Sequence, residues 1–376
     1  MFLGFVLGCS DEPDAAAGVA GTAGVAAAGA GPQNMQAGSA GASGAAGAAG
    51  SAGAAGVEAA AGSSSDASVQ EPEPDAALAD ASIDAGMTTS RGPSAGCEKP
   101  PTSTDSSEEF QAHDVTVSGV DPAFISEHPA NGGSWTERSY YVRLPRDYDP
   151  EKPYPIVIGG GGCGNDSGTS GSSGGLRTLP DDQSDAIVVG LNYVYPTNAG
   201  ACFADDYANT PDLPYFDAVL AQLEADYCVD RDRVFVTGWS SGGWETYLLG
   251  CARAGIVRGI GAAAGGLRMT RPPCADAPVA AIMVAGLQDM ENPIGPLEPP
   301  GKHDSLGSAP ARDDILARNG CVGTETTPWD PEFPACVKYT GCPEAYPVVW
   351  CAIDAGHTEG GDYSANGFWK FWSSLR

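Results

Sequence analysis

The sequence has few basic side chains. Its 376 residues include 19 Lys and Arg against 48 Asp and Glu, which gives a formal net charge of −29. Contacts to phosphate groups need Lys and Arg, so this composition argues against nucleic acid as a partner. It argues equally against a protein held on anionic lipid. The sequence also lacks an uninterrupted apolar run of about 18 residues, and we therefore predict no transmembrane helix.

Histidine is scarce, with four residues, and none of the eleven cysteines belongs to a Cys-x-x-Cys pair. This spacing disfavours a zinc site, so we predict neither a metal ion nor a cofactor. Ten of the cysteines lie from Cys97 onward. An even number in one domain favours disulfides and an oxidising compartment. Buried free thiols are the alternative, and the number of cysteines leaves the pairing open.

After its first nine residues, the first quarter of the chain has few large apolar side chains. Residues 10–96 consist mainly of Ala, Gly, Ser and acidic residues, and Arg91 is the one base among residues 1–96. Such a segment cannot bury enough apolar surface to offset its ordering entropy, so we predict a disordered linker. An Ala-rich helix is the alternative, but each Gly costs about 1 kcal/mol relative to Ala. Residues 97–376 are long enough for one large domain.

The first nine residues are apolar and end in Cys9. Their last residues, Val6-Leu7-Gly8-Cys9, resemble the end of a bacterial lipoprotein signal, in which the cysteine carries the lipid. We therefore expect a signal remnant at 1–9 and a lipid on Cys9. The expected location is extracellular or in the cell envelope, on the surface of a bacterium, where the linker would give an anchored domain reach.

The rest of the sequence alternates strand and helix patterns. Short apolar runs predict strands at 138–144, 155–158, 186–194, 233–237, 279–285 and 348–353. Apolar spacings of three and four predict helices at 216–227, 242–253, 312–318 and 364–375. This alternation indicates an α/β fold with a mainly parallel sheet covered on both faces. In such sheets, functional groups lie on loops at the carboxyl ends of strands.

A Gly-x-Ser-x-Gly motif, Gly238-Trp239-Ser240-Ser241-Gly242, lies between the predicted strand 233–237 and the helix 242–253. A serine nucleophile needs such a sharp strand-to-helix turn, and small flanking residues let the turn pack closely. We predict Ser240 as the nucleophile. The N–H of Ser241, at the helix amino terminus, is expected to face a developing oxyanion. A plain glycine turn is the alternative interpretation, and Ser241 is the rival nucleophile.

A serine nucleophile also needs a base and a carboxylate that orients the base. His357 follows the strand 348–353, whereas His303 lies in a Pro- and Gly-rich loop and is a weaker candidate. We expect His113 and His128 in an extended polar leader, away from this site. Asp289 follows the strand 279–285.

The resulting order of Ser240, Asp289 and His357 is that of α/β-hydrolases. An exposed loop histidine and a turn-capping Asp are the plainer interpretations. Four other aspartates after Ser240 are weaker candidates for the acid, since they do not directly follow a predicted strand or lie too close in sequence to His357; they are Asp276, Asp304, Asp330 and Asp354.

A glycine-rich stretch, Gly159 to Gly164, follows the strand 155–158. Glycine allows a substrate to approach the backbone closely. We predict that the N–H of Cys163 is the second donor to the oxyanion. A phosphate-binding loop is the alternative, but the stretch lacks the Gly-Lys-Ser/Thr ending of such loops.

These segments together resemble the secreted polyhydroxybutyrate depolymerase and feruloyl esterase group of the α/β-hydrolases. The resemblance covers about residues 136–376 and is carried by Arg138–Ile158, Gly162-Cys163-Gly164, Val229–Gly243, Gly286–Asp289 and Cys336–His357. It implies a triad of Ser240, Asp289 and His357, with Cys163 on the oxyanion loop. The chain departs from the family pattern twice, because Gly161-Gly162 and Ala285-Gly286 stand where the family often has His-Gly.

The resemblance implies ester hydrolysis through an acyl-enzyme without a metal or cofactor. The preferred substrate is a feruloyl ester attached to plant cell-wall polysaccharide, and polyester depolymerisation is the alternative. Trp239 and Trp244 either line a pocket for an aromatic acid or belong to the core between helix and sheet. The alternative of another class is a non-catalytic, lipid-anchored binding protein that keeps the hydrolase shell.

Overall fold

A computed structural model describes residues 90–101, 109–164, 185–198, 200–296 and 305–375. The signal-like segment 1–9 with Cys9, the linker up to residue 89, and His303 and Asp304 lie outside the described residues. No helix within the described part of the chain is long and apolar enough to cross a membrane.

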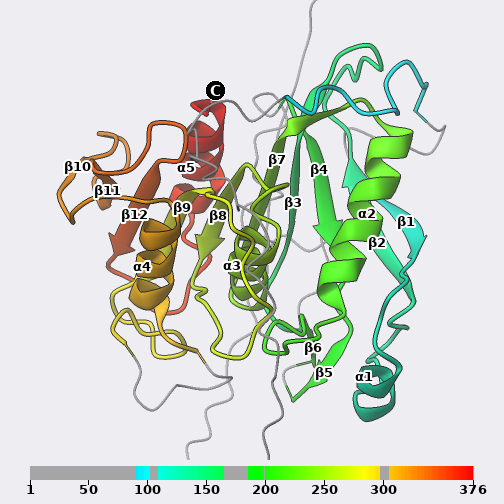
Figure 1. The fold of residues 1–376 in the computed structure, drawn as a ribbon, viewed down its shortest axis with the longest axis horizontal. Coiled ribbons are helices and arrows are strands. Elements are labelled where there is room, and N and C mark those ends of the chain that lie inside the picture. The colour runs from blue at the N-terminus through cyan, green and yellow to red at the C-terminus, as the bar shows by residue number, and fades with distance from the viewer. Residues whose placement is uncertain (1–89, 102–108, 165–184, 199, 297–304, 376) are drawn as a thin grey trace, which may run out of the picture. The chain divides into compact units, whose positions relative to one another are not determined.

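The domain is built on a ten-stranded, mostly parallel sheet (Figure 1). Its strands, in spatial order, are β1 (Gln111–Thr116), β2 (Glu137–Arg143), β4 (Ile187–Leu191), β3 (Tyr154–Gly160), β7 (Val229–Trp239), β8 (Gly259–Ala263), β9 (Ala280–Gly286), β12 (Val348–Ile353), β11 (Cys336–Tyr339) and β10 (Thr326–Pro328). The strands from β4 to β12 in this order are parallel, and the pairings outside them are antiparallel.

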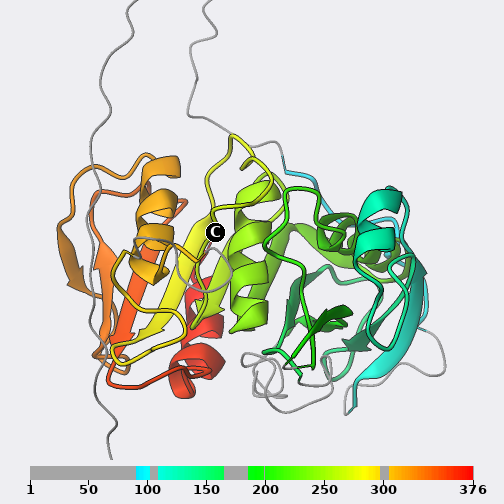
Figure 2. The same ribbon diagram turned by 90° about the horizontal axis from the view of Figure 1, so that it is seen from below.

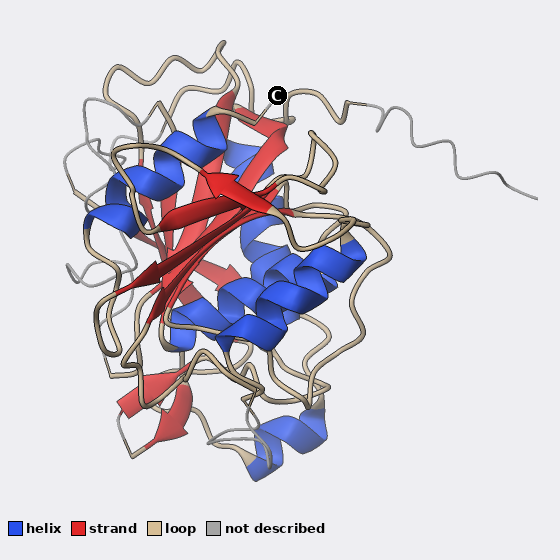
Figure 3. Cartoon of the chain, turned by 90° about the vertical axis from the view of Figure 1, so that its left-hand side faces the viewer, coloured by secondary structure: helices blue, strands red, loops and turns tan. Residues whose placement is uncertain are grey.

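The helices cover both faces of this sheet (Figures 2 and 3). They are α1 (Pro122–Glu127), α2 (Asp212–Asp226), α3 (Ser241–Ala252), α4 (Ser308–Arg318) and α5 (Asp362–Ser373). Side chains of α2, α3 and α4 pack into the larger apolar core on one face. Phe368, Phe371 and Trp372 of α5 pack with Phe235 of β7 on the other face. The predicted α/β class with helices on both faces is therefore confirmed.

A small hairpin of β5 (Tyr195–Thr197) and β6 (Gly200–Cys202) lies beyond the carboxyl ends of the parallel strands (Figure 1). It follows β4, and the strand predicted over 186–194 ends earlier, at Leu191. The hairpin matters for the site because it brings Cys202 to the glycine-rich loop after β3. Cys202 forms a disulfide with Cys163 there.

The prediction of an extended polar leader at His113 and His128 is wrong. His113 lies on β1 and its ring stacks on Tyr140 of β2, with ring centroids 5.3 Å apart. His128 follows α1 and packs against Phe124 and Tyr207. Only Val115 of β1 is buried, because β1 is an edge strand, so its sequence shows little apolar alternation.

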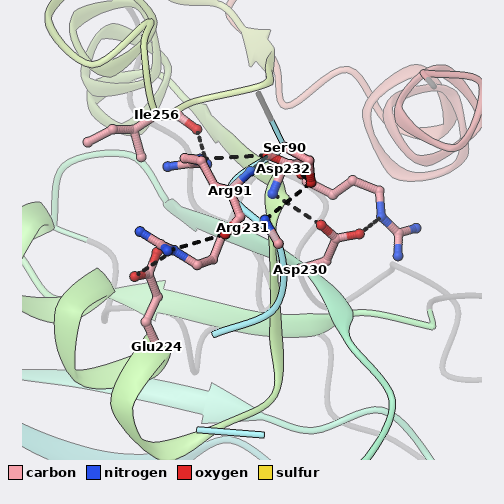
Figure 4. A network of polar contacts seen from close by, with 9 residues as sticks. Ser90, Arg91, Glu224, Asp230, Arg231, Asp232 and Ile256 are labelled. Carbon is pink, nitrogen blue, oxygen red and sulfur yellow. Dashed lines mark hydrogen bonds and ion pairs between the residues drawn. The ribbon is translucent and has the colours of Figure 1, made fainter. Parts of the chain in front are cut away.

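The sequence analysis placed residues 90–96 in the linker, but in the structure they are hydrogen-bonded to residues at and near the amino end of β7 (Figure 4). The backbone N–H of Arg91 donates to Asp232, and the Arg91 guanidinium donates to the carbonyl of Ile256. The buried Ser94 exchanges hydrogen bonds with the backbone of Tyr227 and Val229. The packed domain therefore includes these residues.

All ten cysteines of the domain form disulfides. The pairs are Cys97–Cys228, Cys163–Cys202, Cys251–Cys274, Cys321–Cys342 and Cys336–Cys351. The prediction of disulfides rather than free thiols is confirmed. Five disulfides are typical of a protein that folds in an oxidising compartment, such as the extracellular space.

Candidate active site

Ser240 lies in the turn between β7 and α3, with φ 53° and ψ −121°. A positive φ is costly for any residue with a Cβ, and such strain is found mainly where a side chain must be presented for function. The glycines on either side are required by space. A Cβ at Gly238 would lie 2.3 Å from the carbonyl oxygen of Gly242, and one at Gly242 would lie 2.0 Å from that of Gly160. The turn is therefore closely packed, as the motif predicted, and the structure shows that it packs on β3.

The structure brings Ser240, His357 and Asp289 together from three separate loops. The Oγ of Ser240 lies 2.8 Å from Nε2 of His357, and Nδ1 of His357 lies 2.9 Å from Oδ2 of Asp289. The three loops follow β7, β12 and β9, whose carboxyl ends share one edge of the sheet. The arrangement gives a serine hydroxyl a hydrogen-bonded path to a buried carboxylate.

Asp289 is buried, and its carboxylate is held from both sides. Its Oδ1 accepts hydrogen bonds from the backbone N–H groups of Glu291 and Asn292, at 2.9 and 2.8 Å. Burial alone would raise the pKa of Asp289, but the hydrogen bonds from His357 and these N–H groups lower it below its ordinary value. Asp289 is therefore ionised at neutral pH and able to hold His357 in one orientation.

A second layer of polar contacts, which the sequence analysis missed, supports the loop of Asp289. The side chain of the buried Asn292 donates to the carbonyl of Gly265 and accepts a hydrogen bond from Ser305. Gly265 follows β8, so this contact ties the loop after β9 to the loop after β8. No local motif marks Asn292, because its partners lie 27 and 13 residues away.

The rival candidates lie elsewhere or have other partners. Ser241 is buried, and its Oγ accepts a hydrogen bond from the backbone N–H of Phe203. Asp354 is exposed and bonded to Gln288, and Asp330 pairs with Lys370. Asp276 precedes β9 and so lies at the opposite end of the sheet. Of these candidate acids, only Asp289 meets His357 in the described part of the chain.

The predicted oxyanion loop lies beside the nucleophile and is fixed in several places. Gly161 accepts a hydrogen bond from the N–H of Gly242, and the carbonyl of Gly162 accepts one from the hydroxyl of Tyr193. Cys163 is held by its disulfide to Cys202. Ser241 is the first residue of α3, whose first N–H groups have no partner within the helix. Both predicted donors therefore come from backbone held in place by the fold.

A cavity of about 440 Å³ opens beside Ser240. Trp239, Trp244, Cys163 and Ser241 line it together with His357. The indoles of Trp239 and Trp244 have ring centroids 5.7 and 6.4 Å from that of His357. Both tryptophans therefore line the cavity. Trp244 is in addition buried, so for this residue both interpretations, pocket lining and core packing, apply.

The cavity also has a polar part that the sequence analysis missed. Asp205, Arg268 and Glu291 line it along with Tyr195 of the small hairpin. Arg268 was overlooked because it follows β8, a Gly- and Ala-rich strand that shows no strand pattern in the sequence. The described residues contain no group of three or more His, Cys, Asp and Glu side chains suited to a metal ion.

The strand order, the strained serine turn and the Ser–His–Asp contacts define the protein as an α/β-hydrolase. Its sequence is 30% identical over 228 residues to feruloyl esterase C of Emericella nidulans, which covers 58% of this chain and 76% of that protein. It is 26% identical over 254 residues to feruloyl esterase D of Neurospora crassa, covering 63% and 81% of the two chains. No family model matches the chain.

A solved acetyl xylan esterase from Aspergillus awamori aligns with a TM-score of 0.46 and 13% identity, over 70% of this chain and 99% of that one. The identity and coverage of the curated relatives show that the chain belongs to the feruloyl esterase family. It is a carboxylic ester hydrolase. The esterase relatives and the Ser–His–Asp contacts do not favour the alternative of a non-catalytic binding protein.

Proposed function

We propose that Ser240, His357 and Asp289 form the catalytic triad of an esterase that releases hydroxycinnamic acids from esters attached to plant cell-wall polysaccharides. The observation that carries the proposal is the pair of hydrogen bonds joining Ser240 to His357 and His357 to Asp289. The names of the related feruloyl esterases support the choice of acid.

In the proposed reaction, the Oγ of Ser240 attacks the ester carbonyl carbon while Nε2 of His357 accepts the hydroxyl proton. The tetrahedral intermediate then breaks its bond to the alcohol oxygen, which takes the proton from His357 and leaves. A water molecule, deprotonated by His357, attacks the acyl-enzyme and releases the acid, and Ser240 recovers its proton. Asp289 keeps Nδ1 of His357 protonated and stabilises the charged ring.

The oxyanion of each intermediate would be stabilised by the N–H groups of Ser241 and Cys163. The first of these lies at the amino end of α3, where the helix dipole also favours negative charge. The second is restrained by the disulfide to Cys202.

The test is hydrolysis of methyl ferulate, p-nitrophenyl acetate and polyhydroxybutyrate by the wild type and by Ser240→Ala. We expect turnover of methyl ferulate that falls more than about 10⁴-fold in Ser240→Ala. Ser134→Ala, which removes a hydroxyl bonded to Thr136 far from the triad in sequence, is the matched control. Wild-type turnover no faster than that of Ser240→Ala would contradict the triad. Turnover confined to polyhydroxybutyrate would instead favour the polyester alternative.

We also propose that Cys9 carries a lipid that anchors the enzyme at a cell surface through the linker. Support comes from the sequence Val6-Leu7-Gly8-Cys9 alone, since Cys9 lies outside the described residues. Mass spectrometry of the protein, expressed in a bacterium from the gene with its native upstream codons, is expected to find lipid on Cys9 and none in Cys9→Ser. Absence of lipid on the wild type would contradict this proposal.

A further inference from the structure

The cavity beside Ser240 has an open rim and a buried end. Asn198 and Glu291 on its lining are exposed. Trp244, Asp205 and Arg268 on the same lining are only 8%, 3% and 6% exposed. A polysaccharide continues beyond its ester link, so the alcohol part has to leave through the rim. The acyl group is a chain end, and the buried end of the cavity is suited to hold it.

The buried end is organised around Trp244, which directly follows Gly242 and Gly243 at the start of α3. The guanidinium of Arg268 lies over the indole of Trp244, 3.9 Å from its centroid. The Nε of Arg268 also donates to Oδ2 of Asp205 at 2.7 Å. The indole of Trp244 thus lies near both the ring of His357 and the guanidinium of the buried ion pair. An aromatic acyl group that leaves Ser240 along Trp244 arrives at Asp205 and Arg268.

We propose that the Asp205–Arg268 pair is the specificity-determining contact for the acyl group, and that it binds a neutral hydroxyl on the aromatic ring. This inference rests on the proposed esterase function. A phenolic hydroxyl both donates and accepts, so it matches a carboxylate beside a guanidinium. A ring without the hydroxyl would cover the pair and remove its water without replacing the lost hydrogen bonds, which is the physical basis for rejecting such analogues.

The charges around the cavity favour a neutral substituent over an anionic one. Arg268 is already neutralised by Asp205, and Asp206 and Glu291 add acidic side chains to the lining. A second carboxylate on the acyl group would meet net negative charge there. The expected acyl class is therefore a hydroxylated aromatic acid.

The test compares kcat/KM for methyl p-coumarate and methyl cinnamate, which differ by the ring hydroxyl alone. We expect the wild type to prefer the p-coumarate ester. Arg268→Lys keeps the charge but loses the planar fork and the stacking on Trp244, and we expect it to lower the p-coumarate to cinnamate ratio about tenfold. Asp205→Asn, which keeps the shape of the side chain, is expected to lower the same ratio.

Arg253→Lys is the matched control, because Arg253 also pairs with an aspartate, Asp217, but does so at the far end of α3 and outside the cavity. A merely structural role for Arg268 would slow both esters equally and leave the ratio at its wild-type value, which would overturn the proposal. A wild type that hydrolyses both esters equally well would also overturn it, while the esterase function stands. A wild type that cleaves p-nitrophenyl acetate but neither ester would instead refute the hydroxycinnamoyl function itself.

Discussion

The two ends of β7 show two different uses of charge. At its amino end, Arg91 and Arg231 (Figure 4) pair with acids that are 38% and 21% exposed. Arg233 pairs there with Asp230, which is 24% exposed. Toward the edge of the sheet where β7 has its carboxyl end, the pairs Arg138–Asp212 and Arg268–Asp205 are almost completely buried, and the second pair lines the cavity beside Ser240. Exposed ion pairs contribute little to the free energy of unfolding, because water screens the attraction between their charges. Buried pairs are costly to break, because a lone charge would remain without water.

A buried acid without an ion-pair partner, Glu245, sets the carboxyl end apart further. It lies on α3, 2% exposed, and neither of its oxygens has a hydrogen-bond partner in the described part of the chain. Burial is the main cause that raises the pKa of Glu245 well above its ordinary value, with Asp212 and Asp205 adding to the effect. The raised pKa favours the protonated, uncharged form of Glu245, which adds no charge to the pairs Arg138–Asp212 and Arg268–Asp205. The two buried ion pairs are therefore charge-balanced in themselves, and the additional acids Asp206 and Glu291 line the cavity.

After Ser240→Ala, the largest effect is expected from Asp289→Asn. An amide cannot hold Nδ1 of His357 protonated, so kcat for methyl ferulate should fall about 10⁴-fold. The measurement is steady-state kinetics at neutral pH. Asp354→Asn is the matched control, since Asp354 is exposed and lies three residues before His357. Equal losses in the two variants would contradict the assignment of the acid.

Next in size is the loss of folding stability in Arg138→Met. The guanidinium of Arg138 bonds to Asp212 at 2.9 Å and lies 3.8 Å from the ring centroid of Tyr215. Its removal leaves Asp212 buried and unpaired, so the free energy of unfolding should drop by about 3–5 kcal/mol. Denaturant unfolding measures the change. A drop below about 1 kcal/mol would show that the two ends of β7 do not differ as described.

Glu245→Gln is expected to change the pH dependence of stability. The ordinary pKa of this carboxyl is 4.5 and its folded pKa is higher, so above pH 4.5 the unfolded chain has released a proton that the folded chain still binds. Stability from this group is thus complete below the unfolded pKa and is lost as pH rises toward the folded one, with a slope of about 1.4 kcal/mol per pH unit.

The variant Glu245→Gln should remove this slope. The measurement is denaturant unfolding at a series of pH values, compared with Glu224→Gln, which alters a part-exposed acid paired with Arg231. If the pH dependence of stability survives in Glu245→Gln but disappears in Glu224→Gln, the group that titrates is Glu224, and the prediction for Glu245 is wrong.

The smallest effect is expected from Arg233→Met at the amino end. Arg233 pairs with Asp230 three residues earlier and is 43% exposed. The free energy of unfolding should change by less than about 1 kcal/mol, and added salt should reduce the difference. If Arg233→Met lowers the free energy of unfolding as much as Arg138→Met does, exposed and buried ion pairs do not differ in their contribution to stability, which contradicts the comparison.

Strong local patterns made part of the fold predictable. The structure has a strand or helix wherever the sequence showed a run of β-branched residues or a three-and-four spacing. It also has elements that the sequence did not indicate. β8 reads Gly-Ile-Gly-Ala-Ala and is a strand because β7 and β9 pair with it on both sides. β1 and β11 are short strands whose antiparallel partners decide their structure.

The sequence by itself determined the strained turn at Ser240, because glycine spacing and the change from strand to helix period are local properties. It also determined the chain order of Ser240, Asp289 and His357, since each follows a strand with a recognisable pattern. Only the tertiary structure decided that Asp205, Arg268 and Glu245 gather beside the nucleophile. These side chains come from separate loops and a helix, and their proximity depends on how the strands pair and on how burial raises the cost of leaving a charge alone.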